Sequence, residues 1–400
     1  MATSIGPARS RGVLGGSSWR IGRVSGIDIA IDQSWLLIFL LISMSVSAQL
    51  AASHADSAVA VRWGTAVVVA VAFFASIVLH ELGHSLVAQA LGTRVRSITL
   101  FLFGGVAQLE SEPRKPAHEV GIALAGPAVS VSLAGVFSVL AGLVGEPTLA
   151  GTGLAWLARV NLALGLFNLA PGFPLDGGRV LRGVLWAATG SFARATRIAS
   201  ASGAGIAVLL MLAGAAVVFG ARDWVGGLWL VFLGWFLLSA SRNAVGAMEV
   251  ERILGAVSVR DVLEPVRHAI VSADASVAEL VSTHVLRSGL RTLWVVDPTN
   301  ERLLGIATLR ELASVPAENR AGTRVESVML PVARATSVSA GDTALVGMQR
   351  LAAAGVNQLP VLDDGRLVGA LTRERLLGLL QAGLWLGDAR SSGAAGPART

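Results

Sequence analysis

Long apolar stretches fill much of the first 240 residues, and polar positions gather in the short segments between them. A helix needs about 20 predominantly apolar residues to cross the hydrocarbon core of a bilayer. Six stretches meet this requirement, at residues 34–52, 61–91, 118–143, 151–170, 200–219 and 223–240. The pattern predicts an α-helical polytopic membrane domain over residues 34–245, preceded by an N-terminal segment over residues 1–33.

The segment between the second and third stretches, residues 94–112, has a different pattern. β-branched and aromatic residues flank Gly104 and Gly105, which is typical of a strand, a turn and a second strand. The segment is too short to span a bilayer, so we expect a membrane-associated β hairpin; a loose amphipathic loop on the membrane surface is the alternative. An exposed strand edge there would bind an extended peptide through backbone hydrogen bonds.

After Arg242 the apolar runs shorten, charges become regular, and the chain repeats itself. Residues 257–265 correspond to residues 323–331, and each copy continues with a helical segment and two strands, at a period of about 65 residues. We therefore expect one soluble α/β unit made of two copies, at residues 255–315 and 323–382. The small and polar tail, residues 388–400, is predicted to be disordered.

Composition narrows the chemistry that the chain can perform. Hydrophobic residues make up 53% of the chain and charged residues 14%, which supports lipid as part of its solvent. Because there are no cysteines, a metal site must use His, Asp or Glu, and a cysteine nucleophile is excluded. The net charge of +6 is spread over loops and both ends, so it favours membrane orientation over nucleic-acid binding.

The distribution of basic residues predicts the orientation in the membrane. If the N-terminus lies inside, the outside loops keep only Arg62 and Arg222. No cleaved signal peptide is expected, because the first 33 residues contain neither an apolar run nor a small-residue cleavage site. Both ends are therefore predicted to be cytoplasmic. The inside loops would carry Arg94, Arg96, Arg114, Lys115, Arg179, Arg182, Arg194, Arg197 and Arg242.

The sequence HELGH at residues 80–84 is the strongest local signal. On a helix, residues four apart share one face, so His80 and His84 can present their imidazoles to one zinc ion while Glu81 acts as the general base. The alternative is a pair of buried histidines satisfied by hydrogen bonds. An ionisable side chain within a span is costly unless it is paired or bound to metal, which favours the metal site.

A catalytic zinc ion needs a third protein ligand and an open fourth position. Asp176 is the best candidate, because it lies in PGFPLDGGR at the inner end of the fourth span, the predicted depth of HELGH. Prolines and glycines exclude a regular helix there, and such backbone lines a cavity when it lies at membrane depth. The alternative role for Asp176 is to cap the following helix.

Two amides lie on the fourth span before this loop. Asn161 and Asn168 are seven residues apart, which is about two helical turns. They would either hold the scissile carbonyl or a substrate strand, or make interhelical hydrogen bonds of the kind that polar residues supply in any bundle. The sequence leaves both roles open.

Four motifs in order resemble the site-2 proteases, which are intramembrane zinc metalloproteases. They are HELGH, FGGVA at residues 103–107, LAGPAVS at residues 124–130, and NLALGLFNLAPGFPLDGGRV at residues 161–180. The likeness covers residues 34–380 and is strongest to the bacterial branch with a C-terminal pair of cystathionine-β-synthase-type (CBS) domains, which includes the sporulation factor protease.

The resemblance implies one Zn²⁺ per chain, with His80, His84 and Asp176 as ligands and Glu81 as the catalytic base. Gly104, Gly105 and Asn168 would contact substrate, and Asn161 stays a candidate substrate contact from its position on the fourth span alone. The substrate would be a single-pass membrane protein, cleaved in or beside its transmembrane segment by regulated intramembrane proteolysis. The protease would lie in the bacterial inner membrane, with its N-terminus and its CBS domains in the cytoplasm, and a homodimer through the CBS domains is expected.

The CBS pair departs from its family at one position. In nucleotide-binding CBS domains, a Thr or Ser is followed three residues later by an acid that holds the ribose. The first copy has Thr308 and Glu311, whereas the second places Arg375 three residues after Thr372. The resemblance therefore implies an adenine nucleotide at Thr308 and Glu311, and a structural or partner-binding role is the alternative.

A transporter or channel gated by the CBS pair is the alternative function. In that case His80, Glu81, His84 and Asp176 would form an ion pathway through the membrane. Bound zinc distinguishes the two functions.

Overall fold

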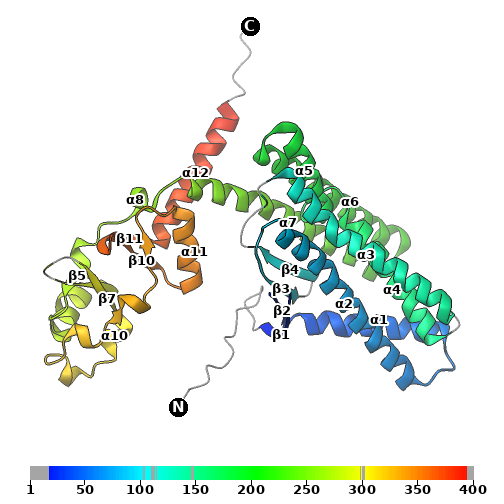
Figure 1. The fold of residues 1–400 in the computed structure, drawn as a ribbon, viewed down its shortest axis with the longest axis horizontal. Coiled ribbons are helices and arrows are strands. Elements are labelled where there is room, and N and C mark those ends of the chain that lie inside the picture. The colour runs from blue at the N-terminus through cyan, green and yellow to red at the C-terminus, as the bar shows by residue number, and fades with distance from the viewer. Residues whose placement is uncertain are drawn as a thin grey trace, which may run out of the picture. The chain divides into compact units, whose positions relative to one another are not determined.

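The computed structural model describes residues 18–101, 104–109, 113, 115–145, 148–297, 299 and 302–393. The chain divides into two compact units, Met1–Val245 and Gly246–Thr400. Helices dominate the first unit, and the second is a mixture of short helices and strands (Figure 1).

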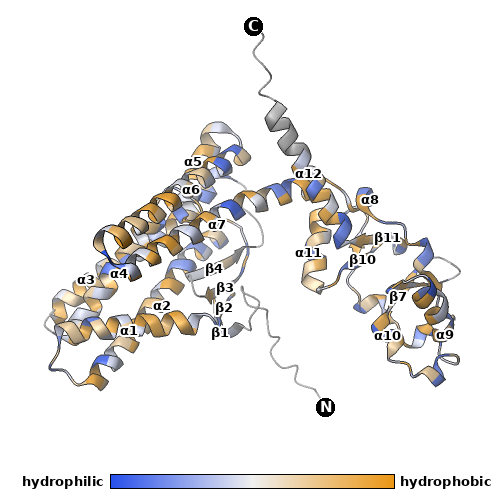
Figure 2. Cartoon of the chain, turned by 180° about the vertical axis from the view of Figure 1, so that it is seen from behind, coloured by the Kyte–Doolittle hydropathy of each residue, from blue (hydrophilic) through white to orange (hydrophobic). Residues whose placement is uncertain are grey.

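Six helices in the described residues are long and apolar enough to cross a membrane. Hydrophobic residues occupy much of the length of these helices (Figure 2), as expected of segments that cross a bilayer. This confirms the prediction of six spans and of a multi-pass membrane protein. The helices are α1 (Trp35–Ser53), α2 (Val59–Ala90), α3 (Pro116–Val144), α4 (Leu149–Asn168), α6 (Phe192–Ala216, continued by a π-helical turn to Ala221) and α7 (Trp224–Gly255).

The chain between α4 and α6 is irregular at first and then helical. The helix α4 ends at Asn168, and Pro171 and Pro174 lie in the loop that follows. A proline lacks the backbone N–H that a helix needs and restricts the residue before it, so the helix cannot continue through this loop. A short helix, α5 (Asp176–Thr189), then begins at the predicted third ligand.

A four-stranded sheet lies against α2 and α3. Ile27 and Ile98 of the sheet are buried together with Leu82 of α2 and Ile122 of α3. The predicted hairpin is confirmed, because β3 and β4 pair antiparallel, and β4 lies at one edge of the sheet. The strands are β1 (Ser18–Val24), β2 (Ile27–Asp32), β3 (Val95–Phe101) and β4 (Gly104–Leu109), in the order β1-β2-β3-β4.

The first two strands of this sheet were not predicted. They form a hairpin whose turn, Ser25 and Gly26, has φ values of 51° and 83°, as a tight two-residue turn requires. Strand β2 then pairs in parallel with β3. The alternation of Ile27, Ile29 and Ile31 with other residues is the strand signal that could have indicated β2.

The second unit contains two similar sheets, one for each sequence copy. In both sheets a short strand pairs in parallel with the first strand of an antiparallel hairpin. The first sheet contains β5 (Ile270–Ser272), β6 (Thr292–Val296), β7 (Leu303–Thr308) and β8 (Leu330–Pro331). The second contains β9 (Val338–Ser339), β10 (Gln358–Asp363) and β11 (Arg366–Thr372).

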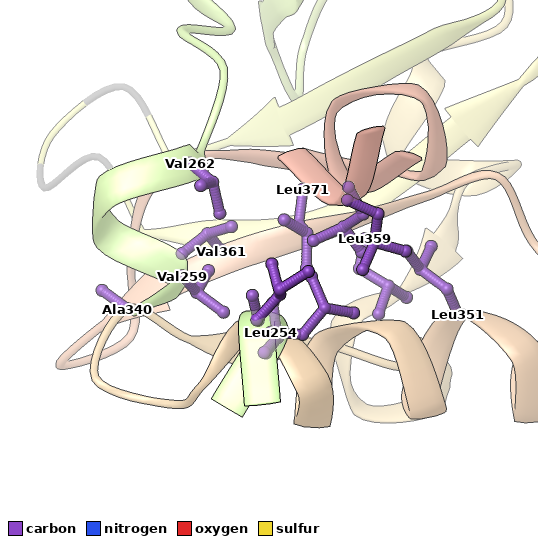
Figure 3. Packing of buried hydrophobic residues seen from close by; sticks show 13 residues of the cluster. Leu254, Val259, Val262, Ala340, Leu351, Leu359, Val361 and Leu371 are labelled. Carbon is purple, nitrogen blue, oxygen red and sulfur yellow. The ribbon is translucent and has the colours of Figure 1, made fainter. Parts of the chain in front are cut away.

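Short helices cover these sheets. Apolar side chains of Val259, from the first copy, and of Leu351 and Leu371, from the second, pack together with Leu254, the penultimate residue of α7 (Figure 3). Leu254 belongs to the second unit, so the C-terminal end of α7 contributes to the core of that unit. The helices are α8 (Val259–Val262), α9 (Val277–Leu280, continued by a π-helical turn to Arg287), α10 (Leu309–Ala313), α11 (Ala344–Ala354) and α12 (Arg373–Gly393).

The predicted disordered tail, residues 388–400, needs a correction in its first part. The helix α12 continues through Gly393, so residues 388–393 are helical. Leu376 and Leu380 bury the start of this helix in the core, and adding residues to an existing helix is easier than nucleating one. Residues 394–400 lie outside the described part of the chain.

Candidate metal centre and active site

The three predicted ligands converge on one point. His80 and His84 lie one turn apart on α2, and their Nε2 atoms are 3.3 Å apart. Asp176, at the start of α5, places its Oδ2 atom 3.2 Å from each of these nitrogens. Both histidines are buried, and the three ligand atoms all lie within 4.8 Å of one another.

This cluster fits a catalytic zinc ion. Two imidazole nitrogens and one carboxylate oxygen are a typical catalytic ligand set, which leaves the fourth tetrahedral position open. Buried groups that aim lone pairs at one another are unfavourable unless a proton or a cation lies between them. The observed cluster therefore has both the composition and the convergence that zinc requires.

Helix α3 contacts both imidazole rings at their Nδ1 atoms, on the side away from Asp176. The Nδ1 atom of His84 lies 2.6 Å from the carbonyl oxygen of Ile122, and that of His80 lies 2.9 Å from Ser130 Oγ. A carbonyl oxygen only accepts hydrogen bonds, so Nδ1 of His84 must carry the proton. The lone pair of its Nε2 atom is then directed at the metal position, and such outer hydrogen bonds fix ligand orientation.

A glycine allows α3 to approach the ligands this closely. A Cβ atom on Gly126 would lie 2.6 Å from His80 Nε2 and even closer to His84 Nε2. Any side chain at this position would therefore occupy the space of the imidazole rings. This steric requirement gives a physical role to LAGPAVS, which contains both Gly126 and Ser130.

Strand β4 passes directly over Glu81. A Cβ atom on Gly105 would lie 2.5 Å from Glu81 Cγ and 3.1 Å from Glu81 Oε1. Gly104, the first residue of β4, has a φ of 127°, a value that other residues rarely adopt. Gly105 therefore lets backbone, instead of a side chain, cover the predicted general base, and Gly104 permits the backbone conformation with which β4 begins. Phe103 of FGGVA lies outside the described residues.

The two amides of α4 have different surroundings. Asn161 is fully buried, and its side chain donates to the carbonyl of Leu157 and, at 3.4 Å, to Ser76 Oγ on α2. This contact corresponds to the interhelical alternative, so a substrate contact by Asn161 stays a prediction without geometric support. Asn168 is half-buried at the last position of α4, just before the loop that leads to Asp176.

In the second unit, the predicted nucleotide residues form a helix cap. The backbone N–H of Thr308 donates to Glu311 Oε2 at 3.0 Å, and its hydroxyl donates to the same atom. Both residues thus cap α10 as a capping box. A nucleotide contact by Thr308 and Glu311 stays a prediction.

A cavity in the second unit lies instead beside Thr372. Its volume is about 980 Å³, and the Thr372 hydroxyl donates to Glu264 at 3.1 Å. Sequence reasoning missed Glu264, because this contact joins residues 108 positions apart. The polar lining includes Glu264, His268, Arg291, Asn357, Thr372 and Arg373.

Comparisons with known proteins agree with this architecture. The profile of peptidase family M50 matches residues 68–153 and 149–212, and that of the CBS domain matches residues 259–318 and 325–382. A protein of Synechocystis sp. named as a zinc metalloprotease, sll0528, is 32% identical over 363 residues, which is 90% of this chain and 95% of that protein.

Two further similarities involve a second relative and a solved structure. Rip3 of Mycobacterium tuberculosis, also named as a zinc metalloprotease, is 33% identical over 88% of this chain and 90% of its own. The structure of a site-2 protease from Methanocaldococcus jannaschii covers 57% of this chain and 95% of its own, with 30% identity and a TM-score of 0.40.

Fold and site together define a polytopic membrane protein in which two histidines and one aspartate converge, a cluster that fits a zinc ion. The chain belongs to peptidase family M50, the site-2 protease family, and carries a C-terminal pair of CBS domains. This confirms the resemblance that the four sequence motifs indicated.

Proposed function

We propose that the protein is an intramembrane zinc-dependent endopeptidase that cleaves a membrane-tethered substrate in or beside its transmembrane segment. The convergence of His80, His84 and Asp176 on a buried point of the membrane unit is the observation that carries this proposal. Relatives named as zinc metalloproteases support it. Hydrolysis of a peptide bond consumes one water molecule and yields a carboxylate and an amine.

Each residue of the site has a role in this proposal. Zinc held by the three ligands would supply a Lewis acid and lower the pKa of a bound water. Glu81, the residue after the first ligand, accepts a proton from the attacking water and passes it to the leaving nitrogen as the C–N bond breaks. Asn168, half-buried beside the loop that leads to Asp176, would donate to the substrate backbone.

The edge strand β4 is the proposed substrate platform. A transmembrane helix must unwind before cleavage, because its carbonyls are occupied by internal hydrogen bonds. An edge strand offers unpaired backbone groups that accept an extended segment. Gly105 brings this edge into contact with Glu81, so a peptide added to β4 would lie beside the general base.

The positive-inside distribution supports an orientation in which both ends are cytoplasmic. The metal centre would then lie toward the cytoplasmic face of a bacterial inner membrane, and the cleaved product would be released inward.

A dimer through the CBS pair stays a prediction.

An adenine nucleotide in the second unit is the proposed regulator. The cavity beside Thr372 is large enough for an organic ligand. Glu264 can accept hydrogen bonds from such a ligand, and Arg291 and Arg373 can donate hydrogen bonds to its phosphate groups. This position differs from Thr308 and Glu311, where the sequence predicts the nucleotide.

Substitution of the general base tests the proposed activity. We expect Glu81→Gln to lower cleavage of a co-expressed single-pass substrate by at least about 100-fold, since an amide cannot accept the proton. Zinc content, measured by mass spectrometry of the purified protein, should stay at one per chain. Glu251→Gln, which changes an exposed carboxylate on α7, is the control and should cleave normally.

Metal content distinguishes this function from a CBS-gated transporter. The protease requires tightly bound zinc, and removal of zinc with a chelator should abolish cleavage until zinc is restored. A protein that contains no zinc and conducts ions in vesicles would support the transporter instead.

A further inference from the structure

A buried ion pair joins α3 to α5 next to the metal centre. Arg182 donates to Glu119 Oε1 through Nε, at 2.5 Å, and through Nη2. The Arg182 side chain is 9% exposed and that of Glu119 is 0% exposed. The metal site described above includes neither residue. In the sequence, Arg182 served only as one of the basic residues that predict the orientation of the chain in the membrane.

Two aromatic rings hold the guanidinium group of Arg182. Its Cζ atom lies 5.0 Å from the centre of the Phe173 ring and 4.5 Å from that of Phe192. Both distances suit cation–π contacts. Phe173 lies three residues before Asp176, so Arg182 contacts the loop that leads directly to the metal ligand.

Glu119 lies on the part of α3 that orients His84. Ile122, whose carbonyl oxygen faces His84 Nδ1, is three residues further along α3 and therefore on a neighbouring face of the same turn. Helix α5 is also close to α3 beside the ion pair, since a Cβ atom on Gly183 would lie 2.6 Å from Val120 Cγ2. One turn of α3 thus contacts both helices that supply the ligands.

A buried ion pair of this kind contributes more to geometry than to net stability. Desolvation of two charges offsets most of their attraction, and well-packed apolar residues often stabilise a protein equally well. Two directional hydrogen bonds, however, restrict how α5 slides or rotates against α3. Asp176 is the first residue of α5, so a shift of this helix moves its carboxylate relative to the two histidines.

We infer that Glu119 and Arg182 are a positioning pair, which fixes α5 on α3 so that the Asp176 carboxylate meets the imidazoles of His80 and His84. The inference rests on the proposed metal centre and adds two residues that set its geometry. Neither residue contacts the reacting atoms.

Zinc affinity is the decisive measurement, made on the full-length protein in detergent by competition with a chromogenic chelator. We expect Glu119→Gln and Arg182→Gln to weaken zinc binding by about 10–100-fold, as loss of outer partners of a metal site does. Arg182→Lys keeps the charge but loses the two-nitrogen contact, so its affinity should lie between these variants and the wild type. In cobalt-substituted protein, the visible spectrum should change most in Glu119→Gln and Arg182→Gln and less in Arg182→Lys.

Ser241→Ala is the matched control. It removes a buried hydrogen bond in which Ser241 Oγ donates to the Ser200 carbonyl at 2.7 Å, between α6 and α7. We expect this variant to lower the melting temperature and leave zinc affinity unchanged. If Arg182→Gln fails to fold, Glu119→Gln and Arg182→Lys still separate the two effects.

Unchanged zinc affinity and cobalt spectrum in folded Glu119→Gln and Arg182→Lys would overturn the inference, even if both variants melt earlier. This outcome is distinct from failure of the proposed function, in which the wild-type protein itself binds no zinc.

Discussion

The two candidate sites of this protein are built in opposite ways. In the membrane unit, α3 packs against His80 and His84 so closely that there is no room for a Cβ atom on Gly126. In the second unit, a cavity of about 980 Å³ remains open between polar side chains such as Glu264 and Arg291. The first site fits an ion, because its donor atoms already converge, whereas the second fits an organic molecule.

This difference predicts how each site tolerates substitution. A site formed by close packing should be sensitive to one added methyl group, because packed interiors transmit steric changes of this size. A site formed by an open cavity should respond mainly to changes in charge and hydrogen bonding. Paired substitutions, each with a matched variant, test this comparison.

The largest effect is expected for Gly126→Ala. The added methyl group would overlap the space of both imidazole rings, so the rings must turn away from the metal position. We expect zinc affinity to fall by at least about 100-fold, the upper end of the effects seen for metal outer partners, with loss of cleavage. Zinc content after dialysis against a weak chelator measures this effect.

Gly121→Ala is the control for that variant, because a Cβ atom on Gly121, also on α3, would have no atom within 4 Å. It should keep its zinc and gain slightly in helix stability. A Gly126→Ala protein that retains wild-type zinc affinity would contradict the close-packing interpretation.

A smaller effect is expected for Gly105→Ala, which should impair cleavage without removing the metal. Its methyl group would lie 2.5 Å from Glu81 Cγ, so either β4 or the general base must move. A displacement of about 1 Å at a reacting group lowers the rate by about 100-fold. The turnover number should fall accordingly while zinc stays at one per chain.

Gly22→Ala, on β1 of the same sheet, would meet no atom within 4 Å and should cleave at the wild-type rate. Loss of zinc in Gly105→Ala would show that β4 supports the metal ligands as well as Glu81.

The sequence indicated the three residues that the structure brings together, because their signals are local. His80 and His84 share one helical face at a spacing of four residues. Asp176 follows a loop that cannot be helical because it contains prolines. The six spans were equally visible, since each is a continuous apolar run. These features depend on neighbours in the chain, which a single sequence displays.

The contacts that support the ligands were not predictable, because they join distant residues. The Ile122 carbonyl is 38 positions from His84, and Glu119 is 63 positions from Arg182. Similarly, the alternation around Ile29 suggests a strand, but only the structure shows that β2 pairs with β3. A single sequence contains no information on such pairings, which depend on how the helices pack.

An intermediate effect is expected for Ser130→Ala. Ser130 is fully buried and lies 2.9 Å from His80 Nδ1, so its loss frees one ring to rotate while His84 remains fixed. We expect zinc affinity to fall by about 10-fold, the lower end of the range for outer partners, as measured by chelator competition.

Ser132→Ala is the matched variant, because Ser132 Oγ donates only to the carbonyl of Ala128 on the exposed side of α3. It should bind zinc as the wild type does. Equal affinity of Ser130→Ala and the wild type would mean that packing alone, through Gly126, orients the ring of His80.

The smallest effect is expected in the open cavity, for Glu264→Gln. The amide keeps the shape of the carboxylate and its bond to Thr372 but loses the charge. A hydrogen bond to a charged acceptor is stronger than one to a neutral acceptor by about 1 kcal/mol, so AMP or ATP should bind about 5-fold more weakly. Isothermal titration of the full-length protein in detergent measures this change.

Glu311→Gln tests the nucleotide position predicted from the sequence in the same way. Glu311 caps α10 through Thr308, so its substitution should lower stability and leave nucleotide affinity unchanged. The reverse result, in which only Glu311→Gln weakens nucleotide binding, would show that the nucleotide binds at Thr308 and Glu311, as the sequence predicts. It would also mean that the cavity beside Thr372 binds another ligand, because the volume of a cavity does not determine the chemistry of its ligand.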